Sequence, residues 1–184
     1  GHIEAVERHA NEDIKNILLP KLNSGEWSGT MNLNEPQVGS DVGALRSCAN
    51  KDKDGTYKVT GQKIYISWGD HSLSSNICHL LLARLPNSPQ GTKGISLFLV
   101  PKYIPDNRGN LTGRNFINTI SLEHQMGLHG SPQAVLEYQN AKAWLIGEEH
   151  QGRMARSTIM NHASSGSAGR GLPHSESSLP QTTS

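Results

Sequence analysis

The sequence lacks the features that would identify a compartment or a partner. Cys48 and Cys78 are its only cysteines and form no CxxC pair, which excludes a disulfide-rich scaffold. No apolar run approaches the roughly 20 residues that cross a bilayer, and residues 1–10 are charged, unlike a signal peptide. We therefore expect both cysteines to be reduced and buried, in a cytoplasmic protein without a membrane partner.

An excess of one charge is also missing. Lys and Arg number 17 against 16 for Asp and Glu, a formal net charge of +1, and no basic or acidic block occurs. Proteins that bind nucleic acids or membrane surfaces usually carry such blocks. A nucleic-acid partner is therefore not expected, and charge names no other partner. The length of 184 residues predicts one main domain with short flanking elements.

Several motifs of metal binding and catalysis are absent. No GxGxxG or GxxxxGK[ST] loop supports a Rossmann or P-loop nucleotide site. Asp70 and His71 lie near Ser67, but no GxSxG elbow surrounds a serine, so a catalytic triad is not predicted. We expect no metal site, because no HxxxH or HExxH spacing occurs among His71, His79, His124, His129 and His150.

Helical periodicity is confined to the two ends of the chain. Apolar residues recur at helical spacing over Ile3–Leu19, Asn11 predicts the cap of a second short helix, and Pro20 is expected to end it. Residues 151–162 return to a helical pattern, which residues 163–184 replace with Ser, Gly and Pro. We expect 1–26 to end an N-terminal helical domain, and 151–184 to be a truncated or frame-shifted start of a C-terminal one, largely disordered after 163.

The middle of the chain, residues 27–150, has the texture of a β-domain. Short β-branched or alternating runs are separated by Gly, Asn, Asp and Pro. This density predicts a mainly β fold, an antiparallel barrel or sandwich flanked by partial helical segments. Tyr103–Asn115 is predicted to be an exposed loop without a chemical role. The expected strands are Trp27–Leu33, Ala44–Ala49, Thr56–Thr60, Gln62–Ser67, Ile77–Arg84, Ile95–Pro101, Asn118–Leu122 and Gln133–Trp144, the last in two pieces.

Two stretches within this region carry candidate chemistry. Met31–Asp41, with the sequence MNLNEPQVGSD, runs from a strand into a turn whose Pro and Gly fix the backbone and whose short polar side chains can bind a ligand. Gly61–Asp70, GQKIYISWGD, places Tyr65 and Ser67 on one strand face, where a ring and a hydroxyl can hold a planar heterocycle. Taken singly, each stretch also fits an ordinary strand and turn.

Together the two stretches resemble the middle-domain signatures of the acyl-CoA dehydrogenase family, a Leu-Thr-Glu-Pro-x-x-Gly-Ser-Asp turn and a Lys-x-Tyr/Trp-Ile-Thr/Ser-x-Gly strand. Gly94–Pro101 is similar to the family's next strand, Glu123–Pro132 to its Lys-Leu-Gly-x-Arg/His-Gly-Ser segment, and Gly147–Gly152 to the link into its C-terminal helical domain. The resemblance covers about residues 5–162. Its wording is closest to the subgroup that includes 3-methylmercaptopropionyl-CoA dehydrogenases, with this chain as a fragment.

The resemblance implies an FAD-dependent enzyme that introduces an α,β double bond into an acyl-CoA thioester. Backbone N–H groups near Leu33 and Asn34 would lie at the pyrimidine edge of the flavin, and Ser67 would lie near its N5. Ser40 would contact the acyl-CoA as well as the flavin pyrophosphate. The implied cofactor-binding residues are Met31, Leu33, Asn34, Gly39, Ser40, Tyr65 and Ser67.

Two departures from the family pattern matter. Asn34 stands where the family usually has Thr, so a side-chain hydrogen bond to the flavin would come from an amide. The family's catalytic base is a Glu of the C-terminal helical domain, beyond the stretch that keeps the resemblance, so we assign no catalytic residue. We expect structural or solvated roles for Glu35, Glu123, Glu148 and Glu149.

Alternative interpretations stay open at this point. The chain resembles, in the same superfamily, flavoproteins of the alkylation response that also meet DNA, although its near-neutral charge disfavours a DNA surface. It could also be an inert β-domain fragment, because the family completes its flavin site with other helices and a neighbouring subunit. The partners that the resemblance implies for the full-length enzyme are acyl-CoA, further copies of itself and an electron-transfer flavoprotein.

Overall fold

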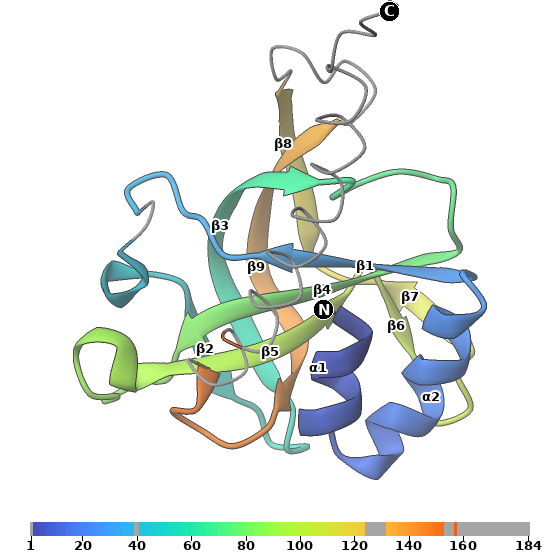
Figure 1. The fold of residues 1–184 in the computed structure, drawn as a ribbon, viewed down its shortest axis with the longest axis horizontal. Helices are drawn as coiled ribbons and strands as arrows, with labels where there is room; N and C mark the ends of the chain where they lie inside the picture. The colour runs from blue at the N-terminus through green and yellow to red at the C-terminus, as the bar shows by residue number, and fades with distance from the viewer. Residues whose placement is uncertain (1, 39–40, 124–131, 153–156, 158–184) are drawn as a thin grey trace, which may run out of the picture.

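The helices of the computed structural model lie at the start of the chain and pack on a curved sheet (Figure 1). The structure describes residues 2–38, 41–123, 132–152 and 157. The helices are α1, His2–His9, and α2, Glu12–Asn23. The Asn11 side chain caps α2, because its Oδ1 accepts a hydrogen bond of 2.9 Å from the Ile14 N–H. This cap was predicted and is confirmed. None of the described helices is long and apolar enough to span a membrane.

Pro20 does not end α2, and that prediction was wrong. The helix continues to Asn23, and the Pro20 carbonyl accepts a hydrogen bond of 3.1 Å from the Ser24 N–H. A proline removes one helical donor but leaves its carbonyl available to the next turn. Leu18 and Leu22, both buried in the core, hold the helix on the sheet on either side of the proline. Tertiary packing therefore outweighs the lost hydrogen bond.

The strands follow the predicted runs closely, and a mainly β fold with flanking helices is confirmed. They are β1 Trp27–Asn32, β2 Cys48–Lys51, β3 Tyr57–Ser67, β4 Asn76–Arg84, β5 Ile95–Pro101, β6 Tyr103–Pro105, β7 Leu111–Arg114, β8 Ile117–Glu123 and β9 Gln133–Ile146. Short 3₁₀ turns, η1 Val42–Ala44 and η2 Gly91–Gly94, precede β2 and β5. The division into domains at residues 26 and 150 stays a prediction, and most of the segment predicted as 151–184 lies outside the described residues.

Three predicted strand boundaries were wrong. The two runs around Gly61 form one strand, β3, because this glycine marks a close approach and not a break: a Cβ there would collide with the Ser47 side chain. Likewise β9 is one strand and not two. The expected strand over Ala44–Ala49 is a 3₁₀ turn followed by β2, which starts only at Cys48.

The sheet curls round until β5 pairs with β4. The order is β1-β4-β2-β3-β9-β5, with β8 on β9 and an additional pairing of β5 with β4. β4 with β5, β5 with β9, β9 with β3, and β3 with β2 are antiparallel, as predicted. β1 instead runs parallel to β4, with Trp27 opposite Asn76. A parallel pair needs a long crossover, and here β2 and β3 form it.

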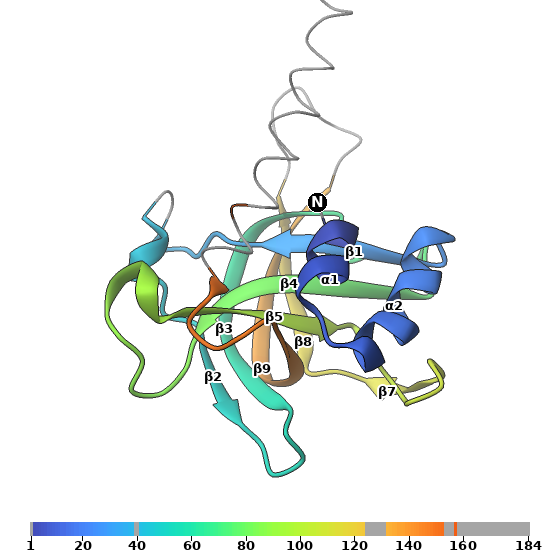
Figure 2. The same cartoon turned by 60° about the horizontal axis from the view of Figure 1, so that its bottom comes forward.

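Two cores lie on opposite faces of β4 and β5. Leu80 and Leu82 of β4 pack with the helices in the first core, whereas Leu81 and Ala83 face a second core enclosed by the curled sheet. This period-two division explains why β4 is a nearly continuous apolar run. Figures 1 and 2 both show α1 and α2 beside β1 and β4. In the described part of the chain, α1 and α2 do not cover the other end of β3, where Ser67 lies (Figure 1).

The predicted loop Tyr103–Asn115 contains a hairpin. β6 and β7 pair antiparallel, with Tyr103 opposite Arg114, as a small sheet of their own. Its turn is closed at Asp106, whose backbone N–H donates 2.8 Å to the Asn110 carbonyl and whose carboxylate accepts from the Arg108 and Asn110 N–H groups. Period-two apolar alternation is missing because neither strand packs on a core. The sequence pattern therefore could not reveal it.

The two cysteines differ in exposure, which corrects the expectation that both are buried. Cys78 is buried on β4, and burial raises the pKa of its thiol to about 12. Cys48 is exposed, because alternation along β2 turns Ala49 inward in its place.

We accordingly expect a thiol reagent to modify Cys48 in the folded chain and both cysteines after unfolding in guanidinium chloride. Counting the thiolate released by an aromatic disulfide reagent measures this. Modification of Cys78 in the folded chain at the rate of Cys48 would contradict the burial that the fold gives it, and Cys48→Ser supplies the blank.

Candidate functional site

The two candidate stretches lie against each other in the fold. β1 ends at Asn32, and a tight turn follows in which the backbones of Glu35 and Val38 exchange hydrogen bonds of 3.2 and 3.0 Å. The carbonyl of Asn34 accepts a hydrogen bond of 3.0 Å from the Ile64 N–H of β3. The turn thereby becomes an extension of the sheet beside Tyr65. Sequence similarity had named both stretches, and the structure brings them together.

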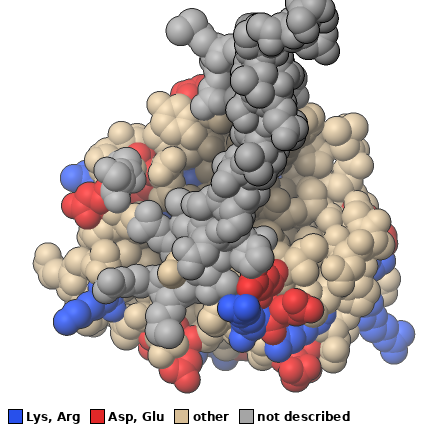
Figure 3. Space-filling view, in the orientation of Figure 1, with Lys and Arg blue, Asp and Glu red and all other residues tan. Residues whose placement is uncertain are grey.

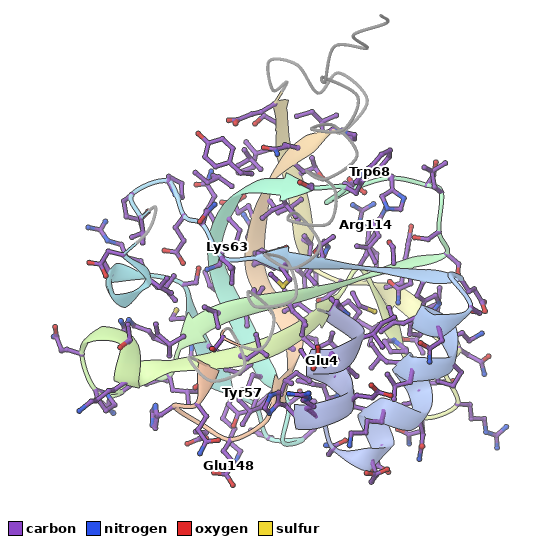
Figure 4. All side chains as sticks on the ribbon, viewed as in Figure 1. Glu4, Tyr57, Lys63, Trp68, Arg114 and Glu148 are labelled. Atoms are coloured by element: carbon purple, nitrogen blue, oxygen red, sulfur yellow. The ribbon has the colours of Figure 1, made fainter. Side chains whose placement is uncertain are left out.

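A buried ion pair joins the same two stretches. The Lys63 ammonium of β3 donates 2.9 Å to Glu35 Oε1 and 2.9 Å to the Leu82 carbonyl. The exposed fraction of the side chain is 0% for Lys63 and 2% for Glu35. Figure 4 shows Lys63 on the inner side of the strands and not at the surface. Burying an unpaired charge is costly, so each member requires the other.

The Glu35 carboxylate is saturated with donors. Oε1 also accepts from the N–H and the hydroxyl of Ser47, at 3.1 and 2.6 Å, and Oε2 accepts from the Arg46 N–H and the Gln37 amide, both at 2.7 Å. Burial acts to raise the pKa of Glu35, but the Lys63 charge and the hydrogen bonds from Ser47 and Arg46 outweigh it and lower that pKa. Glu35 is therefore structural, as predicted, and it is not poised to accept a proton.

An irregularity in β3 turns an aromatic ring to the surface. β3 carries one extra residue between Lys63 and Ile66 relative to β9, a β-bulge, and Tyr65 within it has a φ of 56°. Ile66 is 1% exposed, whereas Tyr65 is 51% exposed and Ser67 is exposed too. The predicted shared outward face of Tyr65 and Ser67 fits this arrangement. The other face of the strand is not uniformly buried, because Ile64 is only half-buried.

Trp68, which sequence reasoning passed over, extends this surface. It is 41% exposed, has a φ of 55°, and its ring meets that of His71 edge-on with 5.8 Å between centroids. Left-handed backbone at bulky residues costs about 1–3 kcal/mol and gathers at functional sites. Two such residues within one short stretch, Tyr65 and Trp68, are the sign of a site here. Their conformations were not readable from alternation, which assumes regular strand geometry.

The remaining predicted residues separate into three groups. Met31 and Leu33 are half-buried and pack against the first core, so their side chains face inward and only their backbone could meet a ligand. Asn34 is half-buried, and its side-chain amide has no recorded hydrogen bond to any described residue. Gly39 and Ser40 lie outside the described residues. All assignments of flavin contacts stay predictions.

A buried polar chain supports β1 from behind and was not foreseen. The Thr30 hydroxyl donates 2.9 Å to Asn32 Oδ1 and lies 2.5 Å from His79 Nδ1, and the Asn32 amide donates to the Tyr138 hydroxyl. Because the hydroxyl proton is used on Asn32, the His79 ring donates to Thr30 and is neutral. Burial lowers the pKa of His79 to about 3. The only sequence signal is polar residues at alternate positions of an otherwise core-facing strand.

The end of β3 is secured by a second charged contact. Asp70 accepts 2.7 Å from Lys102 and 2.6 Å from the Thr119 hydroxyl. Partial burial acts to raise the pKa of Asp70, but these hydrogen bonds and the Lys102 charge lower it. Asp70 therefore ties the loop after β3 to β8 and to the residue after β5.

The other carboxylates of the predicted set are exposed. Glu123 ends β8, Glu148 accepts 3.0 Å from the Gln151 amide, and Glu149 accepts 3.0 Å from the Tyr57 hydroxyl. Among the described residues, no group of three His, Cys, Asp or Glu side chains is placed to hold a metal ion. What the site offers is thus aromatic surface, a hydroxyl and an amide on a rigid support.

Comparison with known proteins assigns this β-rich region to a family. Residues 30–141, more than half of the 184-residue chain, match the family described as acyl-CoA dehydrogenase, middle domain. The chain belongs to the acyl-CoA dehydrogenase family. The match begins in β1 and ends in β9, and so contains the Glu35–Lys63 pair and the β3 bulge.

The relatives of this acyl-CoA dehydrogenase chain are much longer than it is. The 3-methylmercaptopropionyl-CoA dehydrogenase of Ruegeria pomeroyi is 48% identical over 152 residues, which are 83% of this chain and 26% of the relative. The structure of butyryl-CoA dehydrogenase from Megasphaera elsdenii is 26% identical with a TM-score of 0.68, over 83% of this chain and 37% of that one. A chain in the structure of the electron transferring flavoprotein of Acidaminococcus fermentans is 25% identical with a TM-score of 0.68, over 84% and 37%. This chain spans about a quarter of the curated relative's length.

Proposed function

We propose that this chain supplies one wall of the FAD site of an acyl-CoA dehydrogenase that oxidises acyl-CoA thioesters to their α,β-unsaturated products. The observation that carries the proposal is the buried Glu35–Lys63 pair, which locks the turn of one family motif beside the bulged strand of the other. Rigid anchoring of this kind holds binding groups in place before the cofactor arrives. The ion pair thereby fixes the positions of the Tyr65 ring and the Ser67 hydroxyl, which both face outward.

The donor set suits the isoalloxazine ring of FAD. A half-exposed phenol ring at Tyr65 offers a flat apolar surface, and the exposed Ser67 hydroxyl and the Asn34 amide offer hydrogen bonds to an oxygen- and nitrogen-rich edge. Bound FAD would accept the hydride from the acyl β-carbon while the α-proton goes to a base. The chain's own residues, Tyr65 and Ser67, orient the ring.

The base of this reaction is proposed to come from another part of the whole enzyme. Glu35 is ion-paired and Asp70 is held by Lys102, so neither carboxylate is free to take a proton. Glu148 and Glu149 are exposed in the link after β9 and bond to Gln151 and Tyr57. The described residues thus position the cofactor and leave proton abstraction to others.

The proposal extends to partners and place of action. Acyl-CoA is the proposed substrate, further copies of the enzyme and an electron-transfer flavoprotein are the proposed protein partners, and the cytoplasm is the proposed location. A DNA-binding role is disfavoured, because on the described part of the face in Figure 3 the Lys and Arg side chains lie among Asp and Glu. Nucleic-acid surfaces gather positive charge instead.

Titration of the purified chain with FAD tests the proposal. We expect saturable quenching of flavin fluorescence, weakened at least about tenfold by the double change Tyr65→Ala and Ser67→Ala, since stacking and one hydrogen bond together exceed about 1.4 kcal/mol. Phe116→Ala is the matched control, because Phe116 is 67% exposed at a site distant in sequence from both motifs. Equal affinity of the double variant and the parent would refute the assignment of the wall.

A further inference from the structure

A groove of about 460 Å³ lies between the β6–β7 hairpin and the loop that follows β3. Its lining comes from residues 71, 72, 74 and 75, from 102 and 103, and from 111–114. None of the proposed flavin contacts is among them. Figure 4 shows Arg114 and Trp68 at the same end of the molecule, and His71 joins the two regions through its ring contact with Trp68. The groove is thus next to the flavin wall but separate from it.

The groove carries an uncompensated positive charge. Lys102 is neutralised by Asp70, at 2.7 Å, and donates also to the His71 carbonyl at 3.3 Å. Arg114 is exposed at the end of β7, and its guanidinium has no recorded hydrogen bond or ion pair with any described residue. It lies near enough to Asp70 to contribute to the lowered pKa of that carboxyl. Among the described residues, no Asp or Glu lines the groove itself, so Lys102 and Arg114 exceed the one nearby anion, Asp70.

The walls of the groove are held by internal hydrogen bonds, which leaves few donors for a ligand. The Ser75 hydroxyl donates 3.1 Å to the Glu26 carbonyl, and the Thr112 hydroxyl donates 2.9 Å to the Ile104 carbonyl. The exposed Ser72 hydroxyl has no recorded partner among the described residues. The donors of the lining without a recorded partner thus include this hydroxyl, the half-buried Tyr103 hydroxyl and the planar Arg114 guanidinium, whose fork matches two oxygens of one phosphate.

We propose that the groove between the β6–β7 hairpin and the loop after β3 binds a phosphate group, with Arg114 as its main ligand. Lys102 is paired with Asp70, so Arg114 carries the excess charge. Half-buried Tyr103 and exposed Leu111 offer apolar surface beside the phosphate, which favours a phosphate carried on a nucleoside over a free ion. The site stands on its own residues and does not depend on flavin binding.

Calorimetric titration of the chain with adenosine 3′,5′-bisphosphate, inorganic phosphate and adenosine tests this. We expect saturable binding of the bisphosphate that weakens at least about tenfold in Arg114→Gln and less in Arg114→Lys, which keeps the charge but loses the fork. Arg108→Gln is the matched control, because Arg108 is an exposed arginine in the turn of the same hairpin that does not line the groove. Affinity should also fall as salt is raised.

Each outcome decides the matter. Absence of bisphosphate binding, equal weakening by Arg114→Gln and Arg108→Gln, or adenosine binding as tightly as the bisphosphate would overturn the proposal. Inorganic phosphate binding as tightly as the bisphosphate would support the site and identify its ligand as a free oxyanion. The FAD titration of Arg114→Gln should match the parent, so failure of the flavin wall and failure of this groove are told apart.

Discussion

Replacing Lys63 by Met is expected to lower the free energy of unfolding by about 3–5 kcal/mol, because the Glu35 carboxylate then stays buried without a counter-charge. Glu35→Gln should cost a similar amount, since it strands the ammonium between a neutral amide and the Leu82 carbonyl. Chemical denaturation followed by far-ultraviolet circular dichroism measures both. The total free energy of unfolding of a small domain is commonly only about 5–15 kcal/mol, so partial unfolding at ambient temperature would also report the loss.

The double variant Glu35→Gln, Lys63→Met should lose less than the sum of the single changes. Once both charges are gone, neither desolvation penalty remains, and a coupling of about 0.5–3 kcal/mol is expected for residues in direct contact. The recovery will be incomplete, because the donors on Ser47 and Arg46 were oriented for a carboxylate.

An exposed pair on the same strand is the control. Lys58 lies 3.7 Å from Asp52, with side chains 52% and 36% exposed, so Lys58→Met should change the stability by less than about 1 kcal/mol. If Lys63→Met were no more damaging than Lys58→Met, the pair would not be the anchor of the site. A loss of FAD binding in Lys63→Met beyond what unfolding explains would support its role in placing Tyr65.

The free energy of unfolding is expected to fall already between pH 7 and pH 5, which is above the pH range in which carboxylates titrate. Burial, the first cause, lowers the pKa of His79 to about 3, with smaller lowering effects from His2 and Lys102, although Asp70 acts to raise it. Below about pH 6.5 the unfolded chain binds a proton that the folded chain refuses, so stability falls as pH falls. The His79 contribution between pH 7 and pH 5 is about 2 kcal/mol, and His2, with a pKa of about 4, acts in the same direction.

The variant His79→Gln separates this effect from others. Its stability at pH 7 will drop because the contact with Thr30 changes, but its loss between pH 7 and pH 5 should be about 2 kcal/mol smaller than that of the parent. Exposed His150→Gln should leave the slope unchanged. The Glu35 contribution, present above its unfolded pKa of about 4.5 and lost as pH falls through its lower folded pKa, appears only in stronger acid. Parallel curves for the parent and His79→Gln would show that His79 is not buried as neutral imidazole.

Local signals predicted most elements because they act over a few residues. Asn11 predicted the start of α2 through a cap to Ile14, and the largely apolar run of β5 predicted both of its ends. Pro20 misled, since helix–sheet packing at Leu18 and Leu22 is not a local property. The β6–β7 hairpin was missed because it packs on no core and so shows no apolar alternation.

The sequence by itself determined the mainly β class, the flanking helices and the family, because residue periodicity and short motifs are written directly in the chain. Only the tertiary structure decided what those motifs do. Lys63 meets Glu35 across 28 positions and His79 meets Thr30 across 49. The β3 bulge that exposes Tyr65 exists only relative to β9. Such contacts depend on strand register and curvature, which arise when distant segments pack, and no local preference specifies them.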